Sequence, residues 1–265
     1  MRFRVLGPVR LDTRTPAAAK PRAVLATLLV RAGSVVSSDA LIDELWPDEP
    51  PRTAASTLHV YICHVRKALA ESGAGRPLVS RPPGYVLNVE PHDLDLRRFE
   101  TLSEEGRLAL KGEDFGAASR SLGEALALWT GPALSGVPQG VVLRSAATRL
   151  EELRLGVLEQ RITADLKLGR HQELTGELME LAVEHPLRER LHCQLIVALH
   201  RSGRCSDAVR AYRTVRRSLH EELGIGPGPD LTRLHDHVLG AAGSAPASAA
   251  AHRRAPVSRA HRRTP

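Results

Sequence analysis

Cysteine is scarce in this chain, and long apolar runs are missing. The three cysteines, Cys63, Cys193 and Cys205, are odd in number and lack the paired short spacings of a zinc site. They argue against a disulfide framework and against a metal site, so we expect reduced thiols. No apolar run approaches the roughly 18 residues that span a bilayer, and the first residues lack the apolar stretch of a signal peptide. We therefore expect a soluble cytoplasmic protein without membrane contacts.

Sequence signatures of enzymes are missing as well. The 12 histidines form no His-Glu-x-x-His motif, and the chain has no Gly-x-Ser-x-Gly nucleophile elbow. Cys63 and His64 are adjacent, and adjacent residues on a helix do not face one another. The chain also lacks a Gly-x-x-x-x-Gly-Lys-Ser/Thr phosphate loop. We therefore expect neither an enzyme, nor ATP control within this polypeptide, nor a cofactor.

Positive charge is in excess but unevenly distributed. The formal net charge of +7 divides into +4 for residues 1–92, −2 for residues 93–240 and +5 for residues 241–265. The last segment has arginines and no acid, and its Ala, Ser and Pro content buries too little apolar surface to fold. We predict two domains with these bounds, followed by a disordered basic tail.

The first 50 residues predict two paired strands and two helices. Arg2–Leu6 and Val9–Leu11 are strand-like runs separated by a Gly-Pro pair, as in a small antiparallel sheet. A first helix is expected from Pro21 to Gly33, because apolar residues recur there at helical spacing. Ser37 or Ser38 can cap a second helix. The apolar face of that second helix consists of Leu41, Ile42, Leu45 and Trp46.

A third helix is expected from Thr53, its predicted N-cap, to about Glu71. Its buried stripe, at helical spacing, is Leu58, Ile62, Val65 and Leu69. At 100° per residue, the residues that project away from the stripe are Ser56, Val60, Cys63, His64 and Lys67, with Thr53 and Thr57 near the edge and Arg66 flanking. Such a face of small polar groups and cations suits contact with phosphates and base edges.

A basic hairpin follows the third helix. Leu78–Ser80 and Tyr85–Val89 are expected strands joined by Arg81-Pro82-Pro83-Gly84, with Arg81 at the tip. Strands, three helices and a hairpin in this order describe a winged helix, whose third helix enters the major groove of DNA. A solvated helix face is the simpler interpretation of any single residue, but the ordered set favours DNA. The alternative is a helical-repeat adaptor whose winged helix mediates protein contacts.

The remainder of the chain is expected to be helical from about Leu96 to Leu239, with Gly or Pro breaks at 112, 131–132, 136–140, 169, 186 and 203. Four residues recur at an offset of 34, the period of a tetratricopeptide-type repeat. They are Ala164, Gly169, Arg170 and Glu173, matched by Ala198, Gly203, Arg204 and Asp207. A displaced third copy is expected to begin at Gly112. Stacked helix pairs offer surfaces for protein binding or dimerisation, although a plain helical scaffold would show the same pattern.

These motifs resemble the Streptomyces antibiotic regulatory protein family of pathway-specific activators, over residues 1 to about 240. The matching pieces are Leu41–Trp46, the helix from Thr57 to Leu69, the Arg81–Tyr85 turn, Asp95-Leu96 with Arg98-Phe99, and Trp129–Leu134. The resemblance implies an OmpR-type winged helix joined to a bacterial transcriptional activation domain of tetratricopeptide-like helices. The expected fold is therefore mainly α with small β-sheets.

The resemblance also implies partners. They are promoter DNA with direct repeats near the −35 element, bound by a homodimer, and RNA polymerase, contacted through sigma region 4, the alpha C-terminal domain or both. Such a protein controls a secondary-metabolite (antibiotic) gene cluster and associates with the nucleoid. Family members commonly have arginine at the position of His64, and histidine titrates near neutrality. We therefore expect a weaker or pH-dependent base contact there.

Two sets of candidate site residues follow. The residues expected to bind DNA are Thr53, Ser56, Thr57, Val60, His64, Arg66, Lys67 and Arg81. The acidic, proline-bounded loop between the second and third helices is a candidate polymerase contact, and a merely solvated loop is the alternative. The residues of that candidate contact are Trp46, Asp48, Glu49 and Arg52. The basic tail, residues 241–265, is expected to add non-specific DNA affinity.

Overall fold

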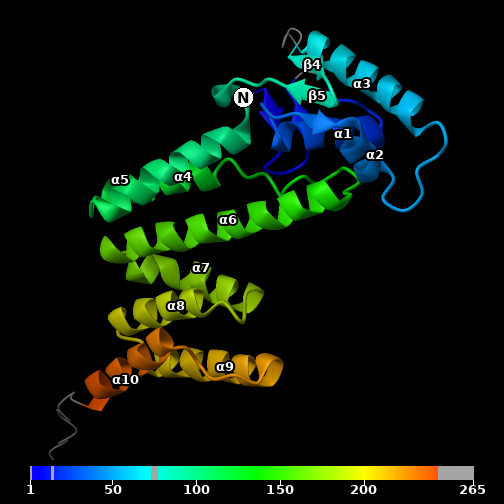
Figure 1. Cartoon of the computed structure of the whole chain (residues 1–265). Helices are drawn as coiled ribbons and strands as arrows, with labels where there is room; N and C mark the ends of the chain where they lie inside the picture. The colour runs from blue at the N-terminus through cyan, green and yellow to red at the C-terminus, as the bar shows by residue number, and fades with distance from the viewer. Residues whose placement is uncertain (1, 13–14, 73–76, 244–265) are drawn as a thin grey trace, which may run out of the picture. The chain divides into compact units, whose positions relative to one another are not determined.

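The computed structural model describes residues 2–12, 15–72 and 77–243 (Figure 1). The chain divides into two compact units, Met1–Leu174 and a second unit from Thr175 onward. The predicted boundary between residues 92 and 93 falls inside the first unit, so the division into two domains and a tail stays a prediction. Of the predicted basic tail, residues 244–265 lie outside the described residues, whereas residues 241–243 are helical.

The chain begins with the predicted pair of strands. Strand β1 (Phe3–Arg4) pairs antiparallel with β2 (Arg10–Leu11). Helix α1 (Ala19–Val30), strand β3 (Val36–Ser37) and helix α2 (Ser38–Leu45) follow. The N-cap of α2 is Ser37, whose Oγ accepts a hydrogen bond from the Ala40 backbone N–H at 3.1 Å. The capping residue predicted from the serine pair is therefore Ser37.

Helix α3 (Ala54–Glu71) has the predicted bounds and buries the predicted stripe. Its predicted cap is wrong in one respect, because the Thr53 side chain accepts no capping hydrogen bond. A capping side chain needs an extended backbone, whereas Thr53 has φ −92° and ψ 11°. Instead, the Thr53 carbonyl accepts hydrogen bonds from the Ser56 hydroxyl and the Thr57 backbone N–H, both at 2.9 Å.

The hairpin after α3 consists of β4 (Leu78–Arg81) and β5 (Gly84–Leu87), and β3 pairs with the other edge of β5. Arg81 pairs with Gly84, so the tip is the Pro82–Pro83 pair and Arg81 lies just before it. The second strand of the hairpin was expected at Tyr85–Val89, but β5 starts one residue earlier, at Gly84, and ends two residues earlier, at Leu87. A Cβ at Gly84 would lie 1.9 Å from the Val36 carbonyl oxygen, so only glycine allows β3 to come this close.

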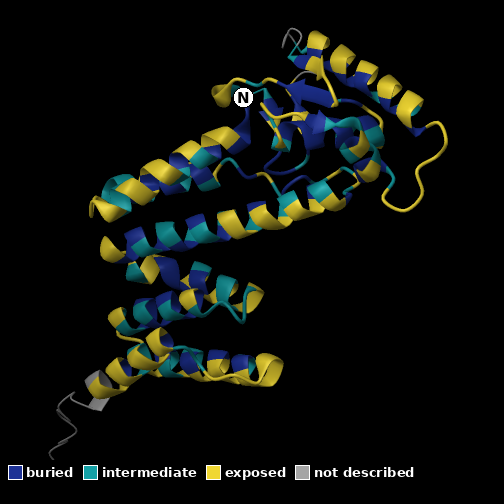
Figure 2. Ribbon diagram, in the orientation of Figure 1, coloured by how far each residue is buried: buried dark blue, intermediate teal, exposed yellow. Residues whose placement is uncertain are grey.

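Three helices complete the first unit: α4 (Asp95–Lys111), α5 (Phe115–Leu126) and α6 (Val141–Lys167). They lie side by side, α5 against α4 and α6 (Figure 1). Their buried faces, dark blue in Figure 2, join the core of the winged helix. Phe99 meets Trp129 edge to face at 5.5 Å between ring centroids within this shared core.

The second unit contains most of α7 (His171–Glu184), together with α8 (Glu189–Arg201), α9 (Cys205–Leu223) and α10 (Pro229–Gly243). Helices α8 and α9 form a hairpin, and α10 packs on both. The sequence analysis missed the break between α9 and α10, where Gly224 adopts the left-handed conformation with φ 68°. The Gly228 backbone N–H then donates to Glu189 Oε2 at 2.8 Å, which fixes the start of α10 to α8.

The predicted repeat corresponds to two similar helix–turn–helix joints. Gly169 and Gly203 both have positive φ, 83° and 77°, and Ala164 and Ala198 are both fully buried. In the first joint the Leu168 N–H donates to the Ala164 carbonyl, and in the second the Ser202 N–H donates to Ala198. The displaced third joint, between α4 and α5, places Glu113 in the left-handed position with φ 59°.

Candidate nucleic-acid interface

The exposed face of α3 carries the residues predicted to read DNA. Ser56, Val60, His64 and Lys67 are exposed, and Thr57 is half-buried. Val60 is 51% exposed although it is apolar and lies in the middle of the helix. A short methyl-bearing side chain at this place allows close approach of the helix and suits contact with a thymine methyl group. The face lies where the sequence analysis predicted it.

Arg66 connects α3 to the hairpin. Its Nη2 donates to Ser80 Oγ on β4 at 2.9 Å, and its guanidinium lies 6.0 Å from the ring centroid of Tyr85 on β5. This contact orients the hairpin relative to α3 and occupies part of the guanidinium's hydrogen-bonding capacity. The sequence analysis placed Arg66 correctly beside the exposed face but did not identify Ser80 as its partner.

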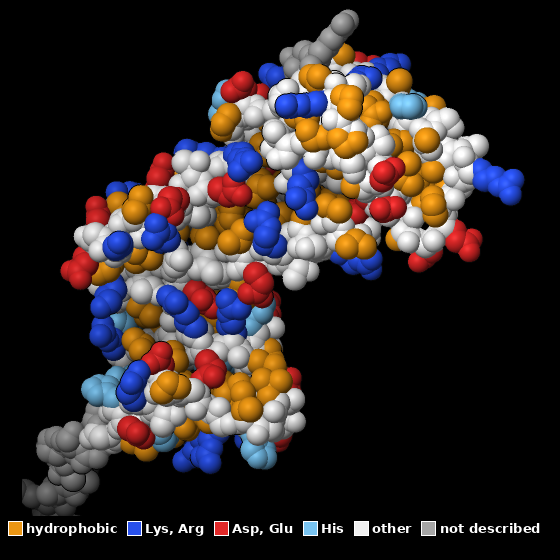
Figure 3. Space-filling model, viewed as in Figure 1, with side chains coloured by type: hydrophobic (Ala, Val, Ile, Leu, Met, Phe, Trp, Pro, Cys, Tyr) orange, Lys and Arg blue, Asp and Glu red, His pale blue; other side chains and the backbone are white. Residues whose placement is uncertain are grey.

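Lys67 and Arg81 are two exposed cations among the residues predicted to bind DNA. Neither has an ion-pair partner within the described ranges. Lys67 and His64 border a hollow of about 280 Å³ whose other wall includes Pro16 and Pro21. On the side of the first unit visible in Figure 3, basic side chains are interspersed with apolar and acidic ones. The face visible in Figure 3 therefore carries no broad, purely basic surface.

The loop between α2 and α3 lies at the N-terminal end of α3, away from the hairpin (Figure 1). Asp48, Glu49 and Arg52 are exposed there. Trp46 is half-buried, with its ring stacked on Tyr61 at 6.2 Å and the Lys20 ammonium 4.2 Å above it. Trp46 therefore fixes the start of the loop by packing, whereas the three charged side chains are exposed to solvent.

Two buried carboxylates that the sequence analysis did not single out as buried groups join the winged helix to α4–α6. The first is Asp95, at the start of α4. Its carboxylate accepts hydrogen bonds from the backbone N–H groups of Val5 and Leu6, at 2.9 and 3.0 Å, and from Leu96 at 2.7 Å. Burial raises the pKa of Asp95, and the hydrogen bonds from Leu6 and Val5 offset part of that effect. The N-terminal strand is thereby fixed to α4.

The second carboxylate is Glu44 on α2, only 4% exposed. It accepts hydrogen bonds from the backbone N–H groups of Gly140 at 2.6 Å, Val142 at 2.7 Å and Leu143 at 3.2 Å. These are unpaired donors of the first turn of α6, where a negative charge is also favoured by the helix dipole. A Cβ at Gly140 would lie 2.5 Å from the Glu44 carbonyl oxygen, so this approach requires glycine.

The Trp129–Leu134 segment gives the N-terminal strand a third attachment. The Thr130 and Leu134 backbone N–H groups donate to the carbonyls of Leu6 and Val5, each at 2.9 Å. Pro8 forms a parallel bridge with Ser135. The Trp129–Leu134 motif identified from sequence thus binds the N-terminal strand. The winged helix and α4–α6 share one continuous core within the first unit.

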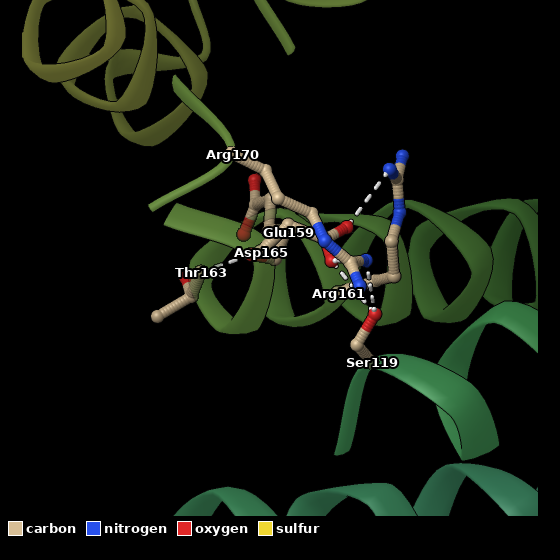
Figure 4. A network of polar contacts seen from close by, with 6 residues as sticks. All are labelled: Ser119, Glu159, Arg161, Thr163, Asp165 and Arg170. Atoms are coloured by element: carbon tan, nitrogen blue, oxygen red, sulfur yellow. Dashed lines mark hydrogen bonds and ion pairs between the residues drawn. The ribbon is translucent and has the colours of Figure 1, made fainter. Parts of the chain in front are cut away.

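A polar network at the end of α6 has a structural role (Figure 4). The Asp165 carboxylate, 6% exposed, accepts hydrogen bonds from Ser119 Oγ at 2.7 Å, Arg170 Nη1 at 2.9 Å and Arg161 Nη1 at 3.3 Å. In the same turn Thr163 Oγ1 donates to the Glu159 carbonyl at 2.8 Å. These contacts fix α5 and the first repeat joint to α6, and every group of the network drawn in Figure 4 has a partner.

Other kinds of site have little support. Within residues 2–12, 15–72 and 77–243, no group of three or more His, Cys, Asp or Glu side chains could hold a metal ion. No helix in this described part is both long and apolar enough to cross a membrane. The cysteines are free, and Cys63 is exposed on α3, whereas burial raises the pKa of Cys193 to about 11.

Comparison with known proteins agrees with this architecture. Residues 94–239 match the family model "Bacterial transcriptional activator domain", and residues 12–87 match "Transcriptional regulatory protein, C terminal". Regulatory protein DnrI of Streptomyces peucetius is 40% identical over 250 residues, which cover 90% of this chain and 92% of DnrI. Regulatory protein AfsR of Streptomyces griseus is also 40% identical, but the chain spans only 24% of its length.

A solved structure is similar over most of the chain. It is Mycobacterium tuberculosis EmbR in complex with a low affinity phosphopeptide, 36% identical in sequence with a TM-score of 0.87. The match covers 90% of this chain and 65% of the EmbR chain. The similarity therefore includes both the winged helix and the helical part of the chain.

Proposed function

The chain belongs to the Streptomyces antibiotic regulatory protein family of transcriptional regulators, and from this premise we propose that it activates a secondary-metabolite gene cluster. It binds direct repeats near the −35 element through its winged helix and recruits RNA polymerase. The observation that carries this proposal is the exposed face of α3, where short side chains are followed by cations at the C-terminal end of the helix, beside a hairpin that Arg66 holds in place.

Base reading is assigned to the middle of α3. Ser56, Thr57, Val60 and His64 are short or planar side chains, which let the helix backbone approach the floor of the major groove. The Ser56 hydroxyl donates to the Thr53 carbonyl, so its oxygen is left to accept a hydrogen bond from a base amino group. Replacing His64 with alanine should change the sequence preference. Full preference for the operator in this variant would remove His64 from the base-reading set.

Phosphate binding is assigned to Lys67 and Arg81, with Arg66 next to Lys67 and with Thr53 at the opposite, N-terminal end of α3. Cations at the end of α3 and at the hairpin flank the base-reading residues on one side, as required for a helix seated in the groove. Because Glu44 and Asp95 join the winged helix to α4–α6, a winged helix oriented by DNA also orients those three helices. The proposed DNA-binding face of α3 and the helices α4–α6 therefore move together.

Polymerase contact is assigned to the exposed charges of the α2–α3 loop, which are Asp48, Glu49 and Arg52. Trp46 is included because its packing fixes the start of this loop. Sigma region 4 and the alpha C-terminal domain are the partners to test. Replacing Asp48 and Glu49 together with alanine should lower transcription at unchanged promoter occupancy. Equal transcription by this variant at matched occupancy would contradict the assignment.

Direct repeats require two copies of the chain arranged head to tail on one face of the duplex, about one helical turn or roughly 34 Å apart. An insertion of about half a turn between the repeats should abolish cooperative binding, and a full-turn insertion should cost less. Cooperative binding that ignores helical phase would contradict the head-to-tail arrangement.

The experiment that tests the function as a whole is a mobility shift on DNA upstream of candidate target genes, repeated over a series of salt concentrations. We expect specific binding whose affinity falls linearly with the logarithm of salt, with a slope set by the number of neutralised phosphates. A protein that shows no preference for any upstream sequence, or no salt dependence, would favour the adaptor alternative instead.

A further inference from the structure

Helix α9 carries a basic face that the proposed function does not use. Arg213, Arg216, Arg217 and His220 are exposed and follow the i, i+3, i+4, i+7 spacing of one helix side. The opposite side buries Ala208, Tyr212, Val215 and Leu219. None of the three arginines has an ion-pair partner among the described residues, whereas neighbouring Arg210 pairs with Asp207. This group of unneutralised charges is suited to an anionic partner.

Helix α7 carries the complementary face within the same unit. Gly176, Met179, Glu180, Val183 and Glu184 lie on one side of the helix, opposite the fully buried Leu178. Val183 is 81% exposed and Met179 is 39% exposed, next to two glutamates without a partner in the described part of the chain. An apolar row beside an acidic row is the composition of a helix that docks on another surface.

We propose that the α7 face of one copy of this chain docks on the α9 face of a second copy. Glu180 and Glu184 are spaced i, i+4, as are Arg213 and Arg217, so both pairs span the same length of about 6 Å along their helices. With the two helices antiparallel, Met179 lies toward the end of the α9 face where Leu223 is 53% exposed, and Val183 packs against the aliphatic stems of the arginines. One contact therefore accounts for both unpartnered faces.

The geometry of such a contact is directional. The two faces differ, so the interface is heterologous. In a pair of copies, the first copy keeps its α9 face free and the second copy keeps its α7 face free. A heterologous contact repeats in one direction, as copies on direct repeats must. The inference thus deepens the proposed function, because it assigns the surfaces through which two DNA-bound copies meet. A DNA backbone bound by α9 would explain the arginines but not the exposed Val183 and Met179 beside unpaired glutamates.

The strength of the contact decides how it is measured. Exposed ion pairs stabilise a complex only weakly, so association of free copies is weak and sensitive to salt. On DNA with two repeats, the bound winged helices raise the effective concentration of one face near the other. The contact is therefore expected mainly as cooperativity between adjacent repeats, of about tenfold.

A charge-reversal cycle in the full chain tests the contact. One variant carries Arg213→Glu and Arg217→Glu, a second carries Glu180→Arg and Glu184→Arg, and a third carries all four changes. Both double variants should lose the cooperativity of about tenfold on two-repeat DNA and keep native affinity for a single repeat. The fourfold variant should regain cooperativity, because its faces are again complementary. Arg144→Glu with Arg149→Glu on α6 is the matched control and should leave cooperativity unchanged.

The other outcomes overturn the proposal. Loss of single-repeat affinity and of salt slope in the α9 variant would assign the arginines to DNA. Unchanged cooperativity in both double variants, or no recovery in the fourfold variant, would show that the faces do not meet. Sedimentation of the same proteins without DNA at low salt separates this inference from the proposed function. Native and fourfold chains should self-associate and the double variants should not, whether or not the native chain binds a repeat.

Discussion

Helices α3 and α9 have the same plan but different exposed faces. Both are long amphipathic helices, and each buries a stripe at i, i+4, i+7 and i+11. On α3 the exposed side has short residues such as Ser56 and Val60 ahead of its two cations, whereas α9 presents Arg213, Arg216 and Arg217 next to one another. Short side chains allow a helix to reach base edges, and long arginines keep a partner at a distance. If the proposed roles hold, the length of the exposed side chains, more than their charge, separates the proposed reading helix α3 from the proposed docking helix α9.

The two helices also differ in how their surroundings are held. Helix α3 packs on α2, whose Glu44 receives three backbone hydrogen bonds from α6. The nearest counterpart beside α9 is Glu189 on α8, which receives one from Gly228. Replacing Glu44 with alanine should lower the free energy of unfolding by about 3 kcal/mol, because buried donors lose their acceptor. The matched change Glu189→Ala should cost about 1 kcal/mol. Urea unfolding of both variants measures the difference in the free energy of unfolding. Equal losses of stability would contradict the conclusion that the surroundings of α3 are held more firmly than those of α9.

Giving α3 the character of α9 should erase its sequence preference. In a Val60→Arg variant the long side chain holds the helix away from the bases while the added charge strengthens phosphate contact. We expect the ratio of operator to random-DNA affinity to fall by about 50-fold, within the range that base contacts supply. Leu153→Arg on α6, also at an exposed apolar residue, is the control and should leave the ratio unchanged. A Val60→Arg chain with native discrimination would mean that α3 does not read bases.

Removing single cations should distinguish the two helices by salt dependence. Lys67→Ala and Arg81→Ala should each weaken binding to all sequences similarly and reduce the salt slope by about 1, since one phosphate contact is lost. Arg217→Ala on α9 should leave the slope on a single repeat unchanged. The measurement is a filter-binding or mobility-shift titration at several salt concentrations. A reduced slope for Arg217→Ala alone would exchange the roles of the two helices.

The smallest expected effect is a pair of opposite pH dependences. Burial raises the pKa of Asp95, so the folded chain binds this proton more tightly than the unfolded chain does. Its contribution to stability is therefore greatest at low pH. That contribution falls as pH rises from 3.8, the ordinary pKa of an Asp side chain, through the raised pKa of the folded chain. Hydrogen bonds from Arg204 and Arg210 hold the pKa of Asp207 below its usual value. Its contribution is present above pH 3.8 and is lost as pH falls through the lowered pKa.

Unfolding of Asp95→Asn and Asp207→Asn, each compared with the native chain over the acid range, measures both dependences. The advantage of the native chain over Asp95→Asn should grow as pH falls. Its advantage over Asp207→Asn should shrink. Parallel pH profiles for the two variants would contradict the assigned burial of Asp95 or the ion pairs of Asp207.

The parts of the fold that the sequence predicts well are those with local periodicity. The bounds of α3 follow from Leu58, Ile62, Val65 and Leu69, because a single amphipathic helix must bury such a stripe whatever lies beneath it. The hairpin and the repeat joints at Gly169 and Gly203 follow from turn chemistry. The break at Gly224 differs from the prediction of continuous helix, because the apolar pattern keeps helical spacing on either side of the Gly and Pro residues there.

The junction could not be predicted, because its partners are far apart along the chain. Glu44 lies in an acidic stretch and looks like one more solvated charge, yet its hydrogen-bond donors come almost a hundred residues later. Asp95 was noticed only as part of a motif. Trp46 was grouped with the exposed loop, whereas the structure stacks it on Tyr61 below Lys20. The face of α3 is different, because exposure of Val60 and His64 follows from one helix alone; their contact with bases stays a prediction.

The contact between the N-terminal strand and the Trp129–Leu134 segment can form only late in translation, because the two segments lie far apart in the sequence. Pro8 is among the first residues to be made, but its partner Ser135 follows only after about 6–25 s at about 5–20 residues per second. During that interval the carbonyls of Val5 and Leu6, residues that are fully buried in the finished fold, lack the backbone hydrogen bonds that Leu134 and Thr130 later donate to them. A ribosome-bound chain that stops at residue 92 therefore holds all of the helices and strands of a winged helix without the surface on which its first strand rests. Chaperone binding to the nascent chain should be concentrated in this interval and should end when residues 129–143 emerge.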